Sequence, residues 1–165
     1  MLRFVVLVSV MMGLYYAVVS TAIFHERLFP AYLRVNADAS AGILRLLGHR
    51  ATATGELVAS PEYSLTIAKG CDAIDPSVLF AAGVLAMQVP LVSKLPALVI
   101  GVSSLLIINL IRIVSLFYVG IHFPKAFNIM HVDVWQPVFI LLAITFWAIW
   151  AVWATRKYVQ EPANT

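Results

Sequence analysis

The chain has 165 residues, of which 62% are hydrophobic and only 12% charged, and its mean hydropathy is +0.93. This composition is too apolar for a water-soluble domain of this size, so it excludes an ordinary soluble protein. The net charge at pH 7 is +3, but the cations are scattered over the flanks of apolar segments and one polar segment, which excludes a nucleic-acid-binding face. We expect a membrane protein in contact with the lipid bilayer.

Four segments approach the length needed to cross a membrane, since about 20 helical residues cross a hydrocarbon core of about 30 Å. The predicted spans are 4–24, 74–91 (a short one), 95–121 and 134–155. The first is longer than the apolar core of a cleavable signal peptide and lacks a clear cleavage site, so we expect it to be retained; if it were cleaved, three spans would remain. The sequence predicts an all-α polytopic membrane protein, a single membrane domain over residues 1–165.

The segment 25–70 is polar and is expected outside the bilayer as an insertion between the first two spans. Pro30 can open a helix and Gly48 can close one. Apolar residues between them recur at helical spacing, namely Tyr32, Val35, Ala39, Ile43 and Leu47, while Arg34, Asp38 and Arg45 take the other face. Such a helix either lies on the membrane surface or caps the bundle, and the sequence leaves both open.

A β-hairpin is predicted in the second half of this insertion. Tyr63, Leu65 and Ile67 alternate with smaller or polar residues, a period of two that is typical of a strand. Ser60-Pro61 supplies a turn, so the expected strands are Thr52–Ala59 and Tyr63–Lys69. The alternative is an extended linker, and either structure leads the chain to Cys71.

Cys71 is the only cysteine, so the chain has no intrachain disulfide and this thiol is either a small buried hydrophobe or a nucleophile. Asp75 is the expected N-cap of the second span and Pro76 its first helical residue. The helix dipole there favours a thiolate, whereas Asp72 and Asp75 oppose one by like-charge repulsion. A neighbouring cation is therefore needed to lower the pKa of the thiol.

The third span carries that cation. An arginine near the bilayer centre costs about 2.5–3.5 kcal/mol on insertion scales, so Arg112 marks a functional site by default. Asn109 lies three residues before it on the same helical face, and Ser115 continues this polar stripe. His131 precedes the fourth span, in which Pro137 is expected to kink the helix or to end an irregular first turn. His25, His49 and His122 compete with His131, with His122 as the nearest substitute.

The predicted topology brings these side chains together. With four spans, both termini share a side, and the short flanks carrying Arg3, Lys94, Arg156 and Lys157 favour a cytoplasmic location for them. In either orientation the end of the insertion, the end of span three and the start of span four lie at the same membrane face. Cys71, Arg112 and His131 are therefore expected to converge, at the outer face in the favoured orientation.

A thiol, an imidazole and a guanidinium at one face suit acyl transfer. The thiolate would attack a peptide carbonyl, the histidine would transfer protons, and the arginine would stabilise the oxyanion or the thiolate. Asn109 would orient the arginine or donate a second hydrogen bond. This chemistry requires no metal or cofactor. Each residue alone also has a structural interpretation: a packed cysteine, an arginine paired with a loop carboxylate, or an interfacial histidine.

Three segments in this order resemble the exosortase/archaeosortase family of membrane cysteine transpeptidases. They are KGCDAIDPSVLF around Cys71, NLIRIVSLFYVG around Asn109 and Arg112, and MHVDVWQ around His131. The short chain and NLIRIVSLFY resemble the exosortase H branch. The resemblance runs from Gly55 to about Trp150. One departure is Asp72-Ala73 after the cysteine, where many relatives have a small polar residue and glycine.

The resemblance implies a function and its residues. Cys71 would be the nucleophile, Arg112 the stabiliser of thiolate or transition state and His131 the general acid and base. The substrates would be secreted proteins with a C-terminal sorting tag, made of a short motif, a transmembrane helix and a basic tail. The enzyme, in a bacterial cytoplasmic membrane, would cleave beside the motif and pass the protein to an envelope acceptor through a thioester.

Two other functions are open at this stage. An intramembrane serine protease is suggested by Ser103-Ser104 after Gly101, although the glycine expected after such a serine is missing. A non-enzymatic scaffold or transporter subunit would use Arg112 in a structural ion pair. Serine replacement tests the first, and the reactivity of Cys71 toward a membrane-impermeant maleimide tests the second.

Overall fold

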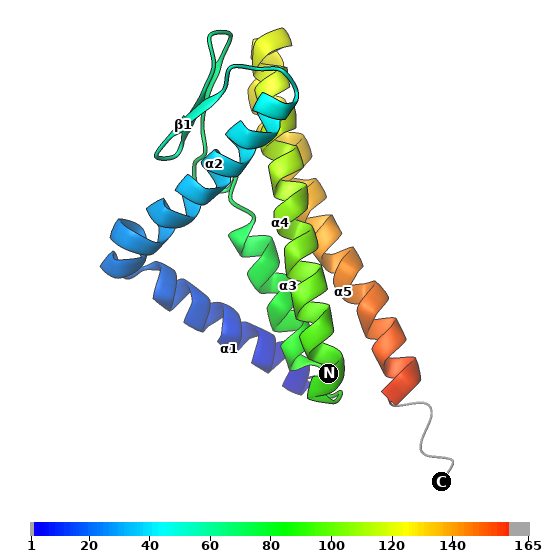
Figure 1. Cartoon of the computed structure of the whole chain (residues 1–165). Helices are drawn as coiled ribbons and strands as arrows, with labels where there is room; N and C mark the ends of the chain where they lie inside the picture. Colours follow the sequence, from blue (N-terminus) through cyan, green and yellow to red (C-terminus); the bar gives the residue numbers. More distant parts are fainter. Residues whose placement is uncertain (1, 159–165) are drawn as a thin grey trace.

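The computed structural model describes residues 2–158, most of them in helices. A long first helix, α1 (Leu2–Val19), is followed by a π-helix, η1 (Phe24–Leu28), and by α2 (Phe29–Leu46). A small sheet leads to the short helix α3 (Ile74–Ala86) and the long helix α4 (Leu91–His122). Figure 1 shows α3, α4 and α5 side by side, with α1 and α2 forming two arms of a triangle beside them.

Three of the described helices are long and apolar enough to cross a membrane: Leu2–Val19, Leu91–His122 and Ile129–Tyr158. Along α1 only Val19 is buried. The helix is apolar on all sides, and most of its side chains face outward. A helix that exposes apolar residues all round needs lipid as its solvent. The protein is therefore a multi-pass membrane protein.

The predicted second span is shorter than expected. Helix α3 begins at Ile74 as predicted but ends at Ala86, so its 13 residues are about 20 Å long, less than a hydrocarbon core. The fourth crossing therefore stays a prediction. The third span was predicted to begin at residue 95, and this start is wrong, because α4 begins at Leu91 and Pro96 lies inside it. Pro96 is the sixth residue of α4, so its ring removes one backbone hydrogen bond and crowds the carbonyl of Val92, and α4 nevertheless continues through it.

The last helix begins earlier than predicted. After a 3-10 turn, η2 (Pro124–Ala126), the π-helix η3 (Ile129–Trp135) continues into α5 (Gln136–Tyr158). His131 therefore lies within a helical segment and not in the loop before it. The irregularity expected near Pro137 is this π-helix, which ends two residues before the proline. π-Helical turns are often found at functional sites.

Helix α2 confirms the helix expected between Pro30 and Gly48, but its buried face is only partly the predicted one: Tyr32 and Ile43 pack against the core, whereas other predicted residues face outward. Val35 and Leu47 are 65% and 55% exposed. The buried side chains lie one position along, and they are Leu33, Asn36, Ala37, Ser40, Ala41 and Leu44. Most of these residues are small, which allows α2 to pack closely on the sheet and on α4. The insertion caps the helices.

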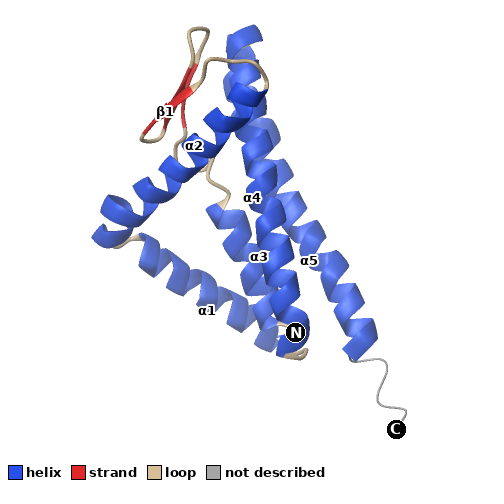
Figure 2. Cartoon of the chain, viewed as in Figure 1, coloured by secondary structure: helices blue, strands red, loops and turns tan. Residues whose placement is uncertain are grey.

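The predicted hairpin is a three-stranded antiparallel sheet in the order β1 (Thr52–Thr54), β2 (Leu57–Ala59) and β3 (Ser64–Thr66) (Figure 2). The turn at Ser60-Pro61 joins β2 to β3 as expected. The single strand predicted over Thr52–Ala59 is wrong, because Gly55, at φ +63°, reverses the chain within it. Val58 pairs with Leu65, and both are buried in the core shared with α2 and α4.

Candidate active site

Cys71 lies in the turn that leads into α3 and is 4% exposed. Asp72 shapes this turn: its Oδ2 accepts a hydrogen bond from the Gly70 N–H at 2.9 Å and its Oδ1 accepts one from the Ile74 N–H at 2.8 Å. Asp75 was predicted to be the N-cap of this helix, but Ala73 holds that position with φ +61°. Pro76 is the third helical residue and not the first. The carboxylate of Asp72 thus fixes the backbone on both sides of the thiol.

Arg112 is 1% exposed and extends from α4 toward the start of α5. Its Nη2 donates a hydrogen bond to the backbone carbonyl of His131 at 3.3 Å, and its Cζ lies 5.4 Å from the centre of the Phe139 ring. Among residues 2–158, the Arg112 Nε has no hydrogen-bond partner and the guanidinium forms no ion pair. The structure therefore brings a buried cation, free of any carboxylate partner in the described chain, to the backbone of His131.

The thiol of Cys71 is under two opposing influences. Burial raises its pKa, and the negative charge of Asp72 raises it further, whereas the positive charge of Arg112 lowers it. Burial is the largest effect, so the net pKa is raised. The sequence predicted that a neighbouring cation would lower the pKa. The cation is present, but in this state it only partly compensates for desolvation, and the resting group is a thiol.

His131 contributes a buried ring atom as well as its carbonyl. Its Nε2 is buried and has no partner among the described residues, and its ring lies 6.0 Å from that of Phe127. The alternative histidines lie elsewhere. His25 is exposed, and His122 is exposed at the end of α4, ten residues or about 15 Å along the helix from Arg112.

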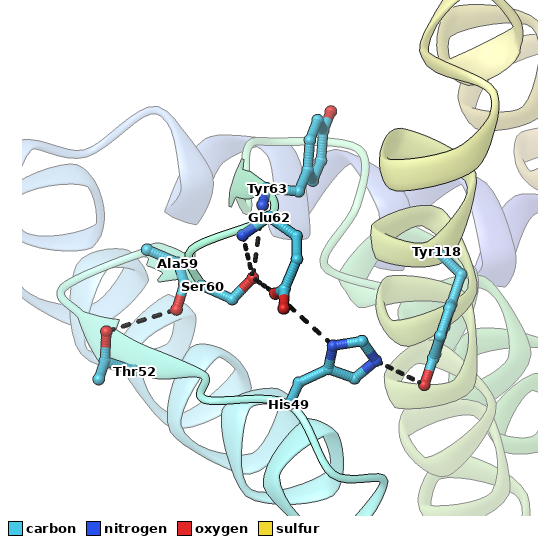
Figure 3. Close-up of polar contacts among 7 residues, drawn as sticks. All are labelled: His49, Thr52, Ala59, Ser60, Glu62, Tyr63 and Tyr118. Carbon is cyan, nitrogen blue, oxygen red and sulfur yellow. Dashed lines mark hydrogen bonds and ion pairs between the residues drawn. The ribbon is translucent and has the colours of Figure 1, made fainter.

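His49 belongs to a different cluster, shown in Figure 3. Its Nε2 lies 2.9 Å from the Tyr118 hydroxyl and its Nδ1 lies 3.7 Å from the Glu62 carboxylate. The Ser60 hydroxyl donates to the same carboxylate at 2.5 Å and lowers the pKa of Glu62. These contacts join the β2–β3 turn to α4, so His49 connects the insertion to the bundle.

Asn109 is fully buried. It was predicted to orient Arg112 or to donate a second hydrogen bond, but its hydrogen-bond partner lies on α2. Its Nδ2 donates to Asn36 Oδ1 of α2 at 3.4 Å, and Asn36 Nδ2 donates to the carbonyl of Tyr32 at 3.0 Å. The Tyr32 hydroxyl then donates to the backbone carbonyl of Asp72 at 2.5 Å. This chain of contacts links α4, one turn before Arg112, to the Cys71 turn.

Ser115 and Asp75, two further predicted supporting residues, have other contacts. The Ser115 hydroxyl donates to the carbonyl of Arg112 within its own helix at 2.7 Å. The Asp75 carboxylate accepts a short hydrogen bond from the Tyr15 hydroxyl, which attaches α1 to α3. The sequence did not reveal Tyr15, Tyr32 or Asn36 as neighbours, because their only signal was a polar group on an amphipathic or apolar helix.

A cavity of about 360 Å³ opens beside the Cys71 turn, between α1, α3, α4 and α5. Arg112 and Asp72 line it together with Asp75 and Gln136, while Met12 and Phe139 are among its apolar walls. Gly70, at φ +91°, faces it, and a Cβ there would meet the Gln136 side-chain nitrogen at 3.1 Å. The cavity therefore reaches Arg112 and the residues on both sides of Cys71, whereas Cys71 and His131 themselves do not line it.

One comparison identifies the family. The family model of the transmembrane exosortases (Exosortase_EpsH) matches residues 1–148, which include Cys71, Arg112 and His131. The chain belongs to the transmembrane exosortase family. No significant match is found among curated proteins or among solved structures. The predicted family is thus confirmed, and in this exosortase the three predicted site residues come from the turn before α3, from α4 and from η3.

Proposed function

We propose that this exosortase-family protein is a membrane-embedded cysteine transpeptidase that cleaves C-terminal sorting tags of secreted proteins. The observation that carries this proposal is Arg112, a buried guanidinium that is hydrogen-bonded to the backbone of His131 and whose charge acts on the thiol of Cys71. Burying a cation without an anionic partner costs free energy, and a thiolate or an oxyanion beside Arg112 would offset this cost.

The first half of the reaction forms a thioester. His131 takes the proton of Cys71, and the thiolate attacks the scissile carbonyl carbon, so that a C–S bond forms and the oxygen becomes an oxyanion beside Arg112. The C–N bond then breaks as the protonated imidazole gives its proton to the leaving amine. The tag is released, and the secreted protein remains on Cys71.

The second half transfers the protein. An acceptor nucleophile of the envelope loses its proton to His131 and attacks the thioester carbon. The C–S bond breaks, the protein leaves on the acceptor, and the protonated imidazole returns its proton to the Cys71 thiolate. These steps use side chains of the protein alone. We further propose that the protein lies in a bacterial cytoplasmic membrane. Both chain ends would lie on the cytoplasmic side and Cys71 at the outer face, as the short cationic flanks favour.

Tag processing in cells tests the proposal. Co-expression with a secreted reporter that ends in a motif, a transmembrane helix and a basic tail should give a shorter reporter on immunoblots with the wild type. Cys71→Ala, Arg112→Ala and His131→Ala should each abolish this shortening at normal membrane levels. His122→Ala is the matched histidine control and should process normally. Normal processing by Cys71→Ala would disprove the thioester mechanism.

A non-enzymatic scaffold is the second candidate, because the resting thiol of Cys71 is only 4% exposed and its pKa is raised. The two functions differ in the fate of this thiol. A tag peptide that ends in an electrophilic ketone should label Cys71 covalently in the transpeptidase and not in a scaffold. The serine-protease alternative has less support, since Ser104 lies eight residues, or about 12 Å along α4, from Arg112.

A further inference from the structure

A second and larger cavity lies at the opposite end of the bundle from Cys71. Its volume is about 660 Å³, and it lies between α4 and α5 with Phe80 of α3 also lining it. The two long helices diverge toward this end, where α4 begins and α5 ends (Figure 1). We call it the α4–α5 groove. Small residues make the α4 wall and aromatic residues most of the α5 wall: Ser93, Ala97, Gly101, Phe146, Trp150 and Trp153.

The groove opens on the apolar outer surface of the helices. Val92, Ile100 and Ile149 line it and are 76%, 66% and 66% exposed. Such residues face hydrocarbon in a membrane-spanning segment. Phe80 packs directly against Gly101 at the inner wall of the groove, where a Cβ at Gly101 would meet the ring at 2.2 Å. An apolar chain is therefore the natural occupant of the interior.

The mouth of the groove carries a fixed positive charge. The Lys157 Nζ lies 5.2 Å from the centre of the Trp153 ring and 5.4 Å from that of Tyr158, and all three residues line the groove. Cation–π contacts of this kind hold the ammonium at the membrane boundary while its stem covers apolar surface. Within residues 2–158, Lys157 has no carboxylate partner.

Within residues 2–158, the charged side chains at this end are cationic. Arg3 and Arg156 are exposed there, and the segments 2–19, 86–104 and 146–158 contain no aspartate or glutamate. Lys94 is not available to a ligand in the same way, because it is 8% exposed and its Nζ donates to the carbonyl of Leu85 at the end of α3 at 2.8 Å. Among residues 2–158, an anionic group at the mouth would thus meet Lys157 and Arg156 and no carboxylate.

We propose that the α4–α5 groove is a binding site for an anionic phospholipid, with one acyl chain between α4 and α5 and the phosphate at Lys157. The apolar walls account for the chain, and the cations without described acidic neighbours account for the headgroup. A peptide helix with a basic tail fits less well, because its tail would be repelled by Lys157 and Arg156. This inference does not depend on the proposed transpeptidase activity.

The test is lipid retention by the full-length protein. Protein purified and delipidated in a neutral detergent is mixed with phosphatidylglycerol or phosphatidylcholine of identical acyl chains and measured by native mass spectrometry. We expect one phosphatidylglycerol to be retained under conditions that remove phosphatidylcholine, and its binding to weaken as salt is raised. Equal retention of the two lipids would mean a nonspecific lipid layer only and would overturn the proposal.

Two substitutions separate headgroup from chain. Lys157→Gln should weaken phosphatidylglycerol binding about fivefold and leave phosphatidylcholine unaffected, whereas Lys125→Gln, an exposed lysine in η2 away from the groove, should change neither. Ala97→Phe fills the groove and should remove the retained lipid. If Lys157→Gln bound phosphatidylglycerol as tightly as the wild type, the proposal would be wrong whatever Ala97→Phe did. A dimer that displaces lipid would assign the groove to a second copy instead.

Discussion

The two ends of the helical bundle differ in whether their charged side chains are buried or exposed. At the Cys71 end the polar groups are buried and tied to the backbone: Arg112 to the carbonyl of His131, Asp72 to two amides, and Tyr32 to the carbonyl of Asp72. At the other end Lys94 is buried and donates to the carbonyl of Leu85, but Arg156 and Lys157 are exposed, and the groove beside Lys157 is apolar. Burial makes a charge expensive and each of its hydrogen bonds valuable, so substitutions should be costly at the first end and mild at the second.

Charge removal should give the largest contrast. Arg112→Ala is expected to lower tag processing by about a hundredfold or more, which is the usual loss when one donor to an oxyanion is removed. Lys125→Gln removes an exposed cation near the same end and should process normally. The rate of reporter shortening in a pulse-chase experiment measures both. A loss of less than tenfold in a stably inserted Arg112→Ala protein would contradict the assigned role.

Glycine substitutions test packing at both ends. A Cβ at Gly120 would meet the Tyr63 ring at 2.2 Å, where the sheet packs on α4, so Gly120→Ala should destabilise the protein by about 1–3 kcal/mol. Gly101→Ala should cost less, because the Phe80 ring can move into the α4–α5 groove. Gly13→Ala, with open space around it, should not lower the melting temperature in detergent. Equal melting temperatures for the Gly120 and Gly13 variants would show that the sheet packs more loosely than described.

Two tyrosines, Tyr32 of the insertion and Tyr118 of α4, provide a finer comparison. Tyr32→Phe removes the hydrogen bond to the Asp72 carbonyl next to Cys71 and should slow processing about two- to tenfold, the value of one such bond. Tyr118→Phe removes the contact with His49, away from the thiol, and should leave processing unchanged. If both variants slowed processing equally, the effect would be general destabilisation and not positioning of the Cys71 turn.

The smallest expected effect is on the titration of the thiol. Because burial and Asp72 raise the pKa of Cys71, its alkylation by iodoacetamide should increase with pH beyond the range in which an exposed cysteine has already reacted. Asp72→Asn removes the negative charge and should move the midpoint to lower pH. Arg112→Gln removes the positive charge and should move it to higher pH. Midpoints that move the other way would show that the charges do not reach the thiol.

Composition and hydrophobic pattern were sufficient for the class of this protein, and the resemblance of three short segments indicated its family. Runs of apolar residues specify long helices locally, and the family match covers the three segments that carry Cys71, Arg112 and His131. The turn at Ser60-Pro61 was also readable, because proline acts on the backbone within a few residues of its own position, whereas Asp75 and Pro76 placed the start of α3 two residues too late.

Tertiary structure decided what depends on neighbours distant in sequence. The buried face of α2 could not be read because two adjacent registers both carried apolar residues, and only packing against α4 and the sheet selects Leu33 and Ala37 over Val35. The partner of Asn109 is Asn36, 73 positions away, and the pKa of Cys71 depends on how deeply the turn is buried. Local sequence sets backbone preferences, whereas burial and hydrogen-bond partners are properties of the assembled fold.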